Sequence, residues 1–314
     1  MKFPFRFLLA TGWLVAVAIP AQAKIERVVE KTFTVQPGGN LHVETQGGNV
    51  TVEPSNDRVV KIIAKEKIHA SSDGEADEIL KKLTLTMEQS GNAIFAEAKY
   101  EKMFSGFHMG SWPPVQVDFV VTVPASFATD LRTSGGDIIV GDLTGKVLAH
   151  TSGGDIKLGH VAADVDASTS GGNVSLVDGS GSVHLRTSGG NVFVGRAVGP
   201  TDLSTSGGDI KVDSVENTLH AGTSGGDVRA GLSGAFKGDC VLSTSGGRVI
   251  ATVDKGVGFH LDASTSGGDV EAGGLTITIE RGGQGKSRLA GDVNGGGPLL
   301  KLRSSGGDVV VNTR

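Results

Sequence analysis

The sequence is short of cysteine and of aromatic residues. It has one cysteine, Cys240, so no internal disulfide can form, and an oxidising compartment would add no covalent cross-link. Phenylalanine, tryptophan and tyrosine together make up 5% of the 314 residues. Stability therefore has to come from burial and from backbone pairing, and any local concentration of aromatic rings stands out.

The sequence also lacks an excess of positive charge. Its formal net charge is -5, whereas a protein that binds nucleic acid through the phosphates needs a basic stripe. After residue 23 it contains no apolar run close to the roughly 20 residues that cross a bilayer. We therefore expect a mildly acidic, soluble chain with no nucleic acid partner and no transmembrane segment once the first residues are removed.

Residues 1–23 have the composition of a signal peptide. Lys2 and Arg6 precede an apolar run, and Ala21-Gln22-Ala23 fits a small-residue cleavage site. The alternative is a retained membrane anchor, for which the apolar run is short. The sequence predicts an exported protein that begins near Lys24 and resides in the periplasm, outside the cell or at its surface.

Glycine, in contrast, is abundant, and much of it belongs to one repeat. The chain has 49 glycines, and the pattern [ST]-S-G-G occurs nine times. The copies start at Thr133, Thr151, Thr169, Thr187, Thr205, Thr223, Thr244, Thr265 and Ser304. Five successive intervals are 18 residues, two are 21, and the last is 39, which implies one degenerate repeat around Leu275 to Gly297.

Apolar residues occupy every second position on both sides of each S-G-G, which predicts two short half-buried strands per repeat. One repeat cannot bury its own apolar face, but stacked copies can. The same columns recur at Leu41 to Val52. We expect an all-β, single-domain parallel β-solenoid (β-helix) of ten or eleven coils. An antiparallel meander is the alternative, because Gly-Gly is also a hairpin signal.

Residues 24–130 differ from the repeat region, residues 131–314. A helix is expected at about residues 74–83, followed by strands at 84–88, 93–99 and 115–123, and together they would cap the solenoid. The other end finishes at Val309 to Arg314 without an obvious cap. This C-terminal edge is a candidate surface for self-association, unless Lys301, Arg303 and Arg314 protect it.

The residue after the glycines is usually Asp or Asn, which suggests either a calcium column or a structural corner. Asn173, Asn191 and Arg248 interrupt the column and favour the corner. In that interpretation the glycines supply positive φ and close stacking, and the Asp or Asn bonds its own turn. The predicted structural corner residues are Gly135, Gly136, Asp137, Gly153, Gly154, Asp155, Gly207, Gly208 and Asp209. We expect no metal and no cofactor.

Catalytic interpretations find little support. Gly222 to Gly226 fits G-x-S-x-G by letter but lies between strands, whereas a nucleophile elbow joins a strand to a helix. His184 and His220 share a column two coils apart, too far to bind one zinc ion. Cys240 replaces an apolar residue in an inward column and reads as a buried, inert thiol. The outward charges include no crowded carboxylate pair, so we expect no enzyme activity.

One stretch outside the repeats is rich in rings. It contains the candidate ligand or partner patch, Tyr100, Phe104, Phe107, His108 and Trp112. Such a loop could stack on sugars or dock a protein partner, or it could pack a cap onto the end of the solenoid.

The T-S-G-G-D-[IV] coils, preceded by a helix-containing segment and the strand Val117 to Pro124, resemble the bacterial "putative adhesin" family, a domain of unknown function. The resemblance covers most of the chain after residue 23. It implies a right-handed β-helix in an envelope protein, and it brings no catalytic residues. We therefore expect a non-enzymatic binding or scaffold protein whose partner is an envelope protein or a polysaccharide. The alternatives are a glycan-active β-helix enzyme and a filament-forming structural protein.

Overall fold

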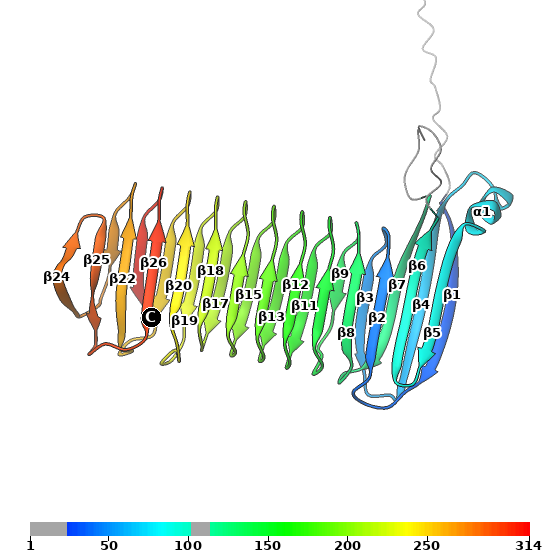
Figure 1. Cartoon of the computed structure of the whole chain (residues 1–314), viewed down its shortest axis with the longest axis horizontal. Coiled ribbons are helices and arrows are strands. Elements are labelled where there is room, and N and C mark those ends of the chain that lie inside the picture. The colour runs from blue at the N-terminus through cyan, green and yellow to red at the C-terminus, as the bar shows by residue number, and fades with distance from the viewer. Residues whose placement is uncertain (1–23, 102–113) are drawn as a thin grey trace, which may run out of the picture.

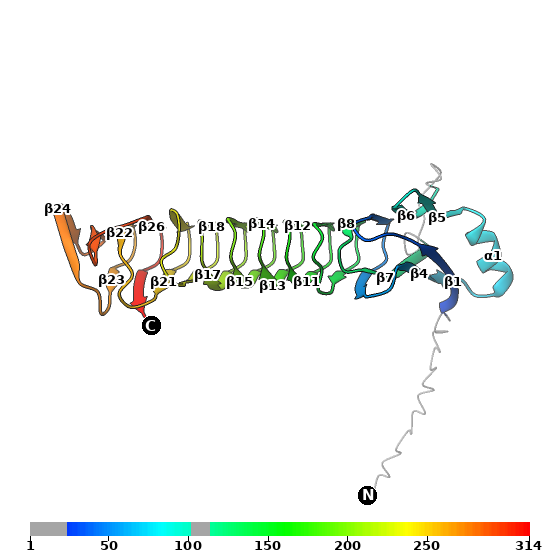
Figure 2. The same cartoon turned by 90° about the horizontal axis from the view of Figure 1, so that it is seen from below.

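The chain forms a long rod of two β-sheets that face each other across a narrow core (Figures 1 and 2). The computed structural model describes residues 24–101 and 114–314. Sheet A has 13 strands and sheet B has 14. Within the described residues, no helix has the length and apolar character needed to cross a bilayer.

The strands follow one another along the rod in the order of their pairing. Sheet A contains β1 (Lys24–Thr34), β4 (Val59–His69), β7 (Val115–Pro124), β3 (Val50–Ser55), β9 (Ile138–Val140), β11 (Ile156–Val161), β13 (Val174–Gly179), β15 (Val192–Ala197), β17 (Ile210–Val215), β19 (Val228–Leu232), β21 (Val249–Val253), β27 (Val309–Thr313) and β23 (Val270–Ala272). Sheet B contains β24 (Ile277–Gly285), β25 (Arg288–Val293), β22 (Phe259–Thr265), β26 (Leu299–Ser304), β20 (Cys240–Thr244), β18 (Leu219–Thr223), β16 (Thr201–Ser204), β14 (Val183–Arg186), β12 (Val165–Ser168), β10 (Val147–His150), β8 (Ala128–Thr133), β2 (Asn40–Thr45), β6 (Ala93–Tyr100) and β5 (Leu83–Ser90).

Each S-G-G repeat joins a strand of sheet B to a strand of sheet A, and successive repeats pair in parallel. Val147 lies beside Val165 in sheet B, and Ile156 lies beside Val174 in sheet A, each one period along the chain. The inward columns of both sheets are buried and form one continuous core. The solenoid prediction is therefore confirmed, and the antiparallel meander is excluded for the repeats.

The threonine of each repeat, or Ser304 in the last one, points inward and connects adjacent coils. Thr151 Oγ1 donates to the carbonyl oxygen of Gly136 at 2.9 Å, and Thr169 Oγ1 donates to Gly154 at 2.9 Å. The second glycine lies directly against the coil before it, since a Cβ on Gly154 would lie 2.1 Å from the Gly136 oxygen. The expected close stacking is confirmed.

Two details of the predicted corner are wrong. The corner glycines do not have positive φ, because the described glycines with positive φ all lie elsewhere, as at Gly38 and Gly256. The Asp or Asn side chain does not bond its own turn. Asp137 Oδ1 instead accepts the N–H of Asp155 in the next coil at 2.8 Å, and Asp155 Oδ1 accepts that of Asn173 at 2.7 Å. Parallel stacking brings the N–H of the next coil within hydrogen-bond distance of this carboxylate.

The N-terminal end of the rod is closed by longer strands and by one helix (Figure 2). The expected strands appear as β5, β6 and β7, while the long antiparallel pair of β1 and β4 was not anticipated. Helix α1 (Asp73–Leu80) starts at the N-cap Ser72, whose hydroxyl accepts the N–H of Glu75. It ends three residues before the expected boundary, because strand β5 begins at Leu83.

The C-terminal end differs from the prediction. The segment expected as a degenerate coil forms an antiparallel hairpin of β24 and β25, which pairs with β22 at the outer end (Figure 1). The last coil, β26 and β27, lies inside the stack, between the coil of β20–β21 and the coil of β22–β23. Its inward residues fill the same columns as any other coil, so position in the chain does not fix position in the stack.

The predicted C-terminal edge for self-association is therefore wrong. Strand β27 has a partner on both sides, and the outermost strands at this end are β23 and β24. Arg314 is bound to Asp254, with 2.7 Å between Arg314 Nε and Asp254 Oδ1. The end of the chain is thus fixed to the body of the rod.

Candidate ligand-binding face

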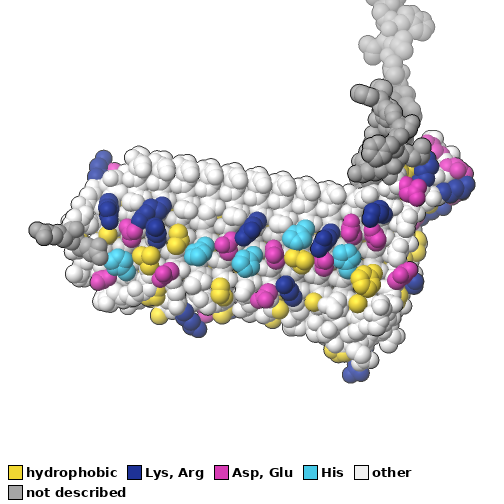
Figure 3. Space-filling view, viewed as in Figure 1, with side chains coloured by type: hydrophobic (Ala, Val, Ile, Leu, Met, Phe, Trp, Pro, Cys, Tyr) yellow, Lys and Arg dark blue, Asp and Glu magenta, His cyan; other side chains and the backbone are white. Residues whose placement is uncertain are grey.

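The outer face of sheet B carries two rows of mostly polar side chains along the rod (Figure 3). One row is His42, Asp130, Leu148, Asp166, His184, Asp202, His220, Val241, Lys301 and Asp262. The other is Glu44, Arg132, His150, Ser168, Arg186, Ser204, Gly222, Ser243, Arg303 and Ser264. Neighbours in a row are about 4.8 Å apart, because each stands on the next strand. The face is a ladder of side chains with a short, regular repeat.

Three acidic residues on this face form ion pairs with arginines. Arg132 Nε lies 2.9 Å from Asp130 Oδ1, and Arg186 lies 3.5 Å from Asp202. Arg303 contacts Asp262 on the neighbouring strand. The described residues contain no group of three or more His, Cys, Asp or Glu side chains arranged to hold a metal ion.

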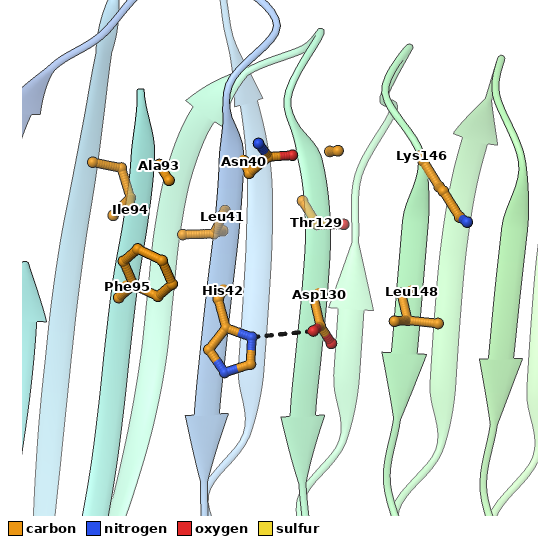
Figure 4. A pocket seen from close by; sticks show the side chains of 11 residues that line it. Asn40, Leu41, His42, Ala93, Ile94, Phe95, Thr129, Asp130, Lys146 and Leu148 are labelled. Carbon is orange, nitrogen blue, oxygen red and sulfur yellow. Dashed lines mark hydrogen bonds and ion pairs between the residues drawn. The ribbon is translucent and has the colours of Figure 1, made fainter. Parts of the chain in front are cut away.

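A groove of about 370 Å³ lies at the N-terminal end of this face (Figure 4). It crosses β6, β2, β8 and β10, whose outward side chains form its two sides. Phe95, His42, Asp130 and Leu148 stand in one line across these strands. Ala93, Asn40, Ala128 and Lys146 form the parallel line. The two alanines leave the floor low, and the larger side chains make the walls.

The aromatic wall of the groove is exposed. Phe95 has 44% of its surface exposed, and its ring centroid is 6.2 Å from that of His42. His42 Nδ1 lies 3.2 Å from Asp130 Oδ2, which holds the imidazole between the phenyl ring and the carboxylate. An exposed ring in a fixed orientation offers an apolar surface to a ligand.

The carboxylate of the groove stays ionised at neutral pH. Burial raises the pKa of Asp130, but the hydrogen bonds and positive charges of Arg132 and His42 more than offset that effect, so the net shift is downward. Lys146 is exposed and has no ion pair among the described residues. The groove therefore presents one acceptor, one amide at Asn40 and one ammonium group.

The residues predicted for the ligand patch are placed only in part. Tyr100 ends strand β6 and is 7% exposed, and burial raises the pKa of its hydroxyl. Phe104, Phe107, His108 and Trp112 lie outside the described residues, as does the predicted signal peptide. The predicted corner residues, from Gly135 to Asp209, lie at the turns between the two sheets and not on the groove.

Sequence reasoning missed the groove itself. Phe95 was visible as an aromatic residue at an outward position of an expected strand, which is a weak signal. Its proximity to Asp130 depends on β2 pairing with both β6 and β8. Cys240, in contrast, behaves as expected, since it is buried and burial raises the pKa of its thiol to about 12.

The coils stack through parallel strands in two facing sheets, and this arrangement defines a class of protein, the parallel β-solenoids. Within that class the chain belongs to the family "Toastrack DUF4097", whose sequence model matches residues 39–312. A search of curated proteins finds no relative.

Three solved structures illustrate the similarity. A "putative cell adhesion protein" from Clostridium sporogenes is 12% identical, covering 92% of this chain and 100% of its own, with a TM-score of 0.25. A "putative adhesin" from Parabacteroides distasonis is 11% identical, covering 91% and 97%, with a TM-score of 0.43. A "putative lipid binding protein" from the same organism is 13% identical, covering 90% and 96%, with a TM-score of 0.41. Similarity this low does not indicate the ligand.

Proposed function

We propose that the protein is an exported, non-enzymatic binding or scaffold protein of the cell envelope, and that the outer face of sheet B is its ligand face. The observation that carries the proposal is the groove at Phe95 and Asp130, which continues into two ordered rows of side chains. A rigid surface with evenly spaced polar groups suits an extended ligand, because each coil can offer the same kind of contact.

Export is supported by the composition of residues 1–23, and residence in the periplasm, outside the cell or at its surface would follow. An exported protein with a single buried cysteine needs no disulfide when long backbone ladders stabilise it. Localisation is tested by fractionating cells that express the full chain. Protein found in the cytoplasmic fraction would overturn this part of the proposal.

A glycan-active enzyme is the first alternative. It would need a carboxyl group held protonated near a second carboxylate. On the described part of sheet B, Asp130, Asp202 and Asp262 each form an ion pair with an arginine. This pairing supports binding over hydrolysis.

A filament-forming protein is the second alternative, and strand β1 is its best candidate edge. β1 is 11 residues long and exposes 58% of Val28 and 38% of Val29. If β1 strands of two copies paired in antiparallel fashion about a two-fold axis at Val28, Glu26 of one copy would lie opposite Glu30 of the other. With the axis at Val29, Arg27 would lie opposite Lys31. Like charges directly opposite each other destabilise a strand pair, so this edge is protected against self-pairing.

The experiment measures the binding of purified protein to immobilised envelope polysaccharide, to envelope protein and to lipid vesicles. Size-exclusion chromatography with light scattering measures its oligomeric state. Binding without turnover by a monomer supports the proposal. Turnover would favour the enzyme, and polymers formed without ligand would favour the filament. A Trp112→Ala variant tests separately whether the ring-rich stretch, Tyr100 to Trp112, contributes to binding.

A further inference from the structure

We infer that the groove on β6, β2, β8 and β10 binds a saccharide, with the apolar face of a sugar ring against Phe95 and its hydroxyl groups toward Asp130. This inference rests on the proposed function, because it names the ligand class of the same face.

The shape suits a flat ligand of limited size. The outermost of the four strands are three strand spacings apart, about 14 Å, and the two lines of side chains are two residues apart, about 7 Å along the strand. Within the second line Ala93 and Ala128 are short and leave a low, methyl-lined floor, while Phe95 stands at one end of the first line (Figure 4). A ring with an apolar face can therefore lie on the floor and still contact the phenyl group.

The polar groups suit a ligand rich in hydroxyls. Asp130 is an ionised acceptor held in place by His42 and Arg132, while Asn40 offers both donors and an acceptor. Lys146 adds a donor at the other side of the groove. A hydroxyl can donate to the carboxylate and accept from the amide or the ammonium group, so one sugar ring can satisfy several of these groups together.

The strand pairing excludes recognition of a peptide by strand addition. Each of the four groove strands already has a partner on both sides, so its backbone donors and acceptors are used within sheet B. A ligand must therefore be recognised by side chains alone. An extended peptide would lose its main source of affinity here, whereas a saccharide needs no backbone partner.

The charges argue against a lipid. Lys146 is the one lysine or arginine among the groove-lining residues, and the ionised Asp130 lies two strand positions further along the next strand. An anionic headgroup would meet one cation and one anion. An acyl chain would cover a carboxylate and remove it from water, which is costly without a new partner.

The groove also sets the direction of a longer ligand. It runs across the strands, along the axis of the rod, and its line of side chains continues from Leu148 to Asp166 and His184. A linear oligosaccharide bound at Phe95 can thus extend over the following coils. A branched one would be blocked on the side where the walls rise.

The test uses an array of linear and branched oligosaccharides, followed by calorimetric titration of the best one into purified protein. Phe95→Ala and Asp130→Asn should each weaken binding by about tenfold, since an aromatic contact or a charged hydrogen bond of this size is lost. Phe193→Ala is the matched control, because Phe193 is an outward ring on strand β15 of sheet A, beneath Lys211. It should leave the affinity unchanged, and melting temperatures verify that all three variants fold.

The outcomes separate the two proposals. If oligosaccharides bind equally well to Phe95→Ala and Asp130→Asn, the groove assignment is wrong and the binding function stands. If no oligosaccharide binds but vesicles of anionic phospholipid do, the ligand class is wrong and a binding function again stands. If no envelope component binds at all, the proposed function itself fails.

Discussion

Thr151 donates its hydroxyl hydrogen to the carbonyl oxygen of Gly136 in the preceding coil, with 2.9 Å between the two oxygens. The same contact recurs along the rod, for example from Thr205 to Gly190 at 2.8 Å and from Ser304 to Gly247 at 2.8 Å. Each of these side chains lies in the core, so its hydroxyl needs this partner. The T-S-G-G motif therefore recurs from coil to coil because its hydroxyl group connects neighbouring coils.

Replacing Gly154 by alanine should destabilise the protein strongly. A Cβ there would lie 2.1 Å from the carbonyl oxygen of Gly136, and that backbone cannot move without breaking the strand ladders on either side. We expect a loss of about 3 kcal/mol. The control is Gly153→Ala, whose Cβ would be 3.5 Å from its nearest neighbour. It should cost less than about 1 kcal/mol. Guanidinium unfolding followed by circular dichroism measures both, and equal losses would show that close stacking is not the reason.

Thr129 and Thr133 provide a second matched pair on one strand. Both are buried, but Thr129 Oγ1 has no hydrogen-bond partner, whereas Thr133 Oγ1 donates to Gly48 at 2.8 Å. Thr129→Val should stabilise the protein by about 1 kcal/mol, because it removes an unsatisfied buried hydroxyl. Thr133→Val should destabilise it by about 1 to 3 kcal/mol, because it leaves the Gly48 oxygen unpaired. Thermal unfolding distinguishes them, and shifts of the same sign would contradict the assignment.

Glu66 should make stability depend on pH. It lies on strand β4 with 6% of its surface exposed, and burial raises the pKa of its carboxyl above 4.5, partly offset by the charge of Arg27. A raised pKa means that the folded state binds the proton more tightly than the unfolded state. The stabilisation that results from this proton is therefore present below pH 4.5 and is lost as the pH rises through the pKa of Glu66 in the folded state.

Glu66→Gln should therefore raise the melting temperature at pH 7 and change it little at pH 4. The exposed Glu88 on strand β5 provides the control, since Glu88→Gln removes a charge that is already in water and should change the melting temperature little at pH 7. An equal effect of Glu66→Gln at both pH values would show that charge burial is not involved.

Removal of divalent cations should leave the melting temperature unchanged. One side-chain oxygen of most Asp and Asn residues in the column accepts a backbone N–H from an adjacent coil, as in Asn191 Oδ1 with the N–H of Asp209 at 2.7 Å. Calcium prefers six to eight oxygen ligands, and the described residues contain no group of three or more His, Cys, Asp or Glu side chains placed to hold a metal ion. Scans with and without a chelator measure this. A drop of several degrees that calcium restores would revive the calcium interpretation.

The repeating part of the fold was predicted well from the sequence, because apolar and polar residues alternate around each S-G-G and the apolar ones face the core. It could not predict the order of the coils at the C-terminal end. Leu261 and Leu300 fill the same column with the same side chain, so nothing local decides which coil stacks on Cys240. The candidate site could not be predicted from the sequence, for a related reason. Phe95 and Asp130 lie on either side of His42 on β2, and only the pairing of distant strands places them there.

Hydrogen exchange should show that the C-terminal coil is protected as well as the middle of the rod. The strands β26 and β27 have partners on both sides, and Leu300, Leu302, Val309 and Val311 are fully buried. The amides of Val309 and Val311 should therefore exchange as slowly as those of Val192 and Val194 in strand β15, because opening them requires the coils on both sides to separate. Amides of β24, which has a partner on one side, should exchange much faster. If the C-terminal coil instead lay at the end of the rod, the amides of Val309 and Val311 would exchange as fast as those of β24. In that case, deleting residues 299–314 would also leave the amide of Leu261 protected from exchange.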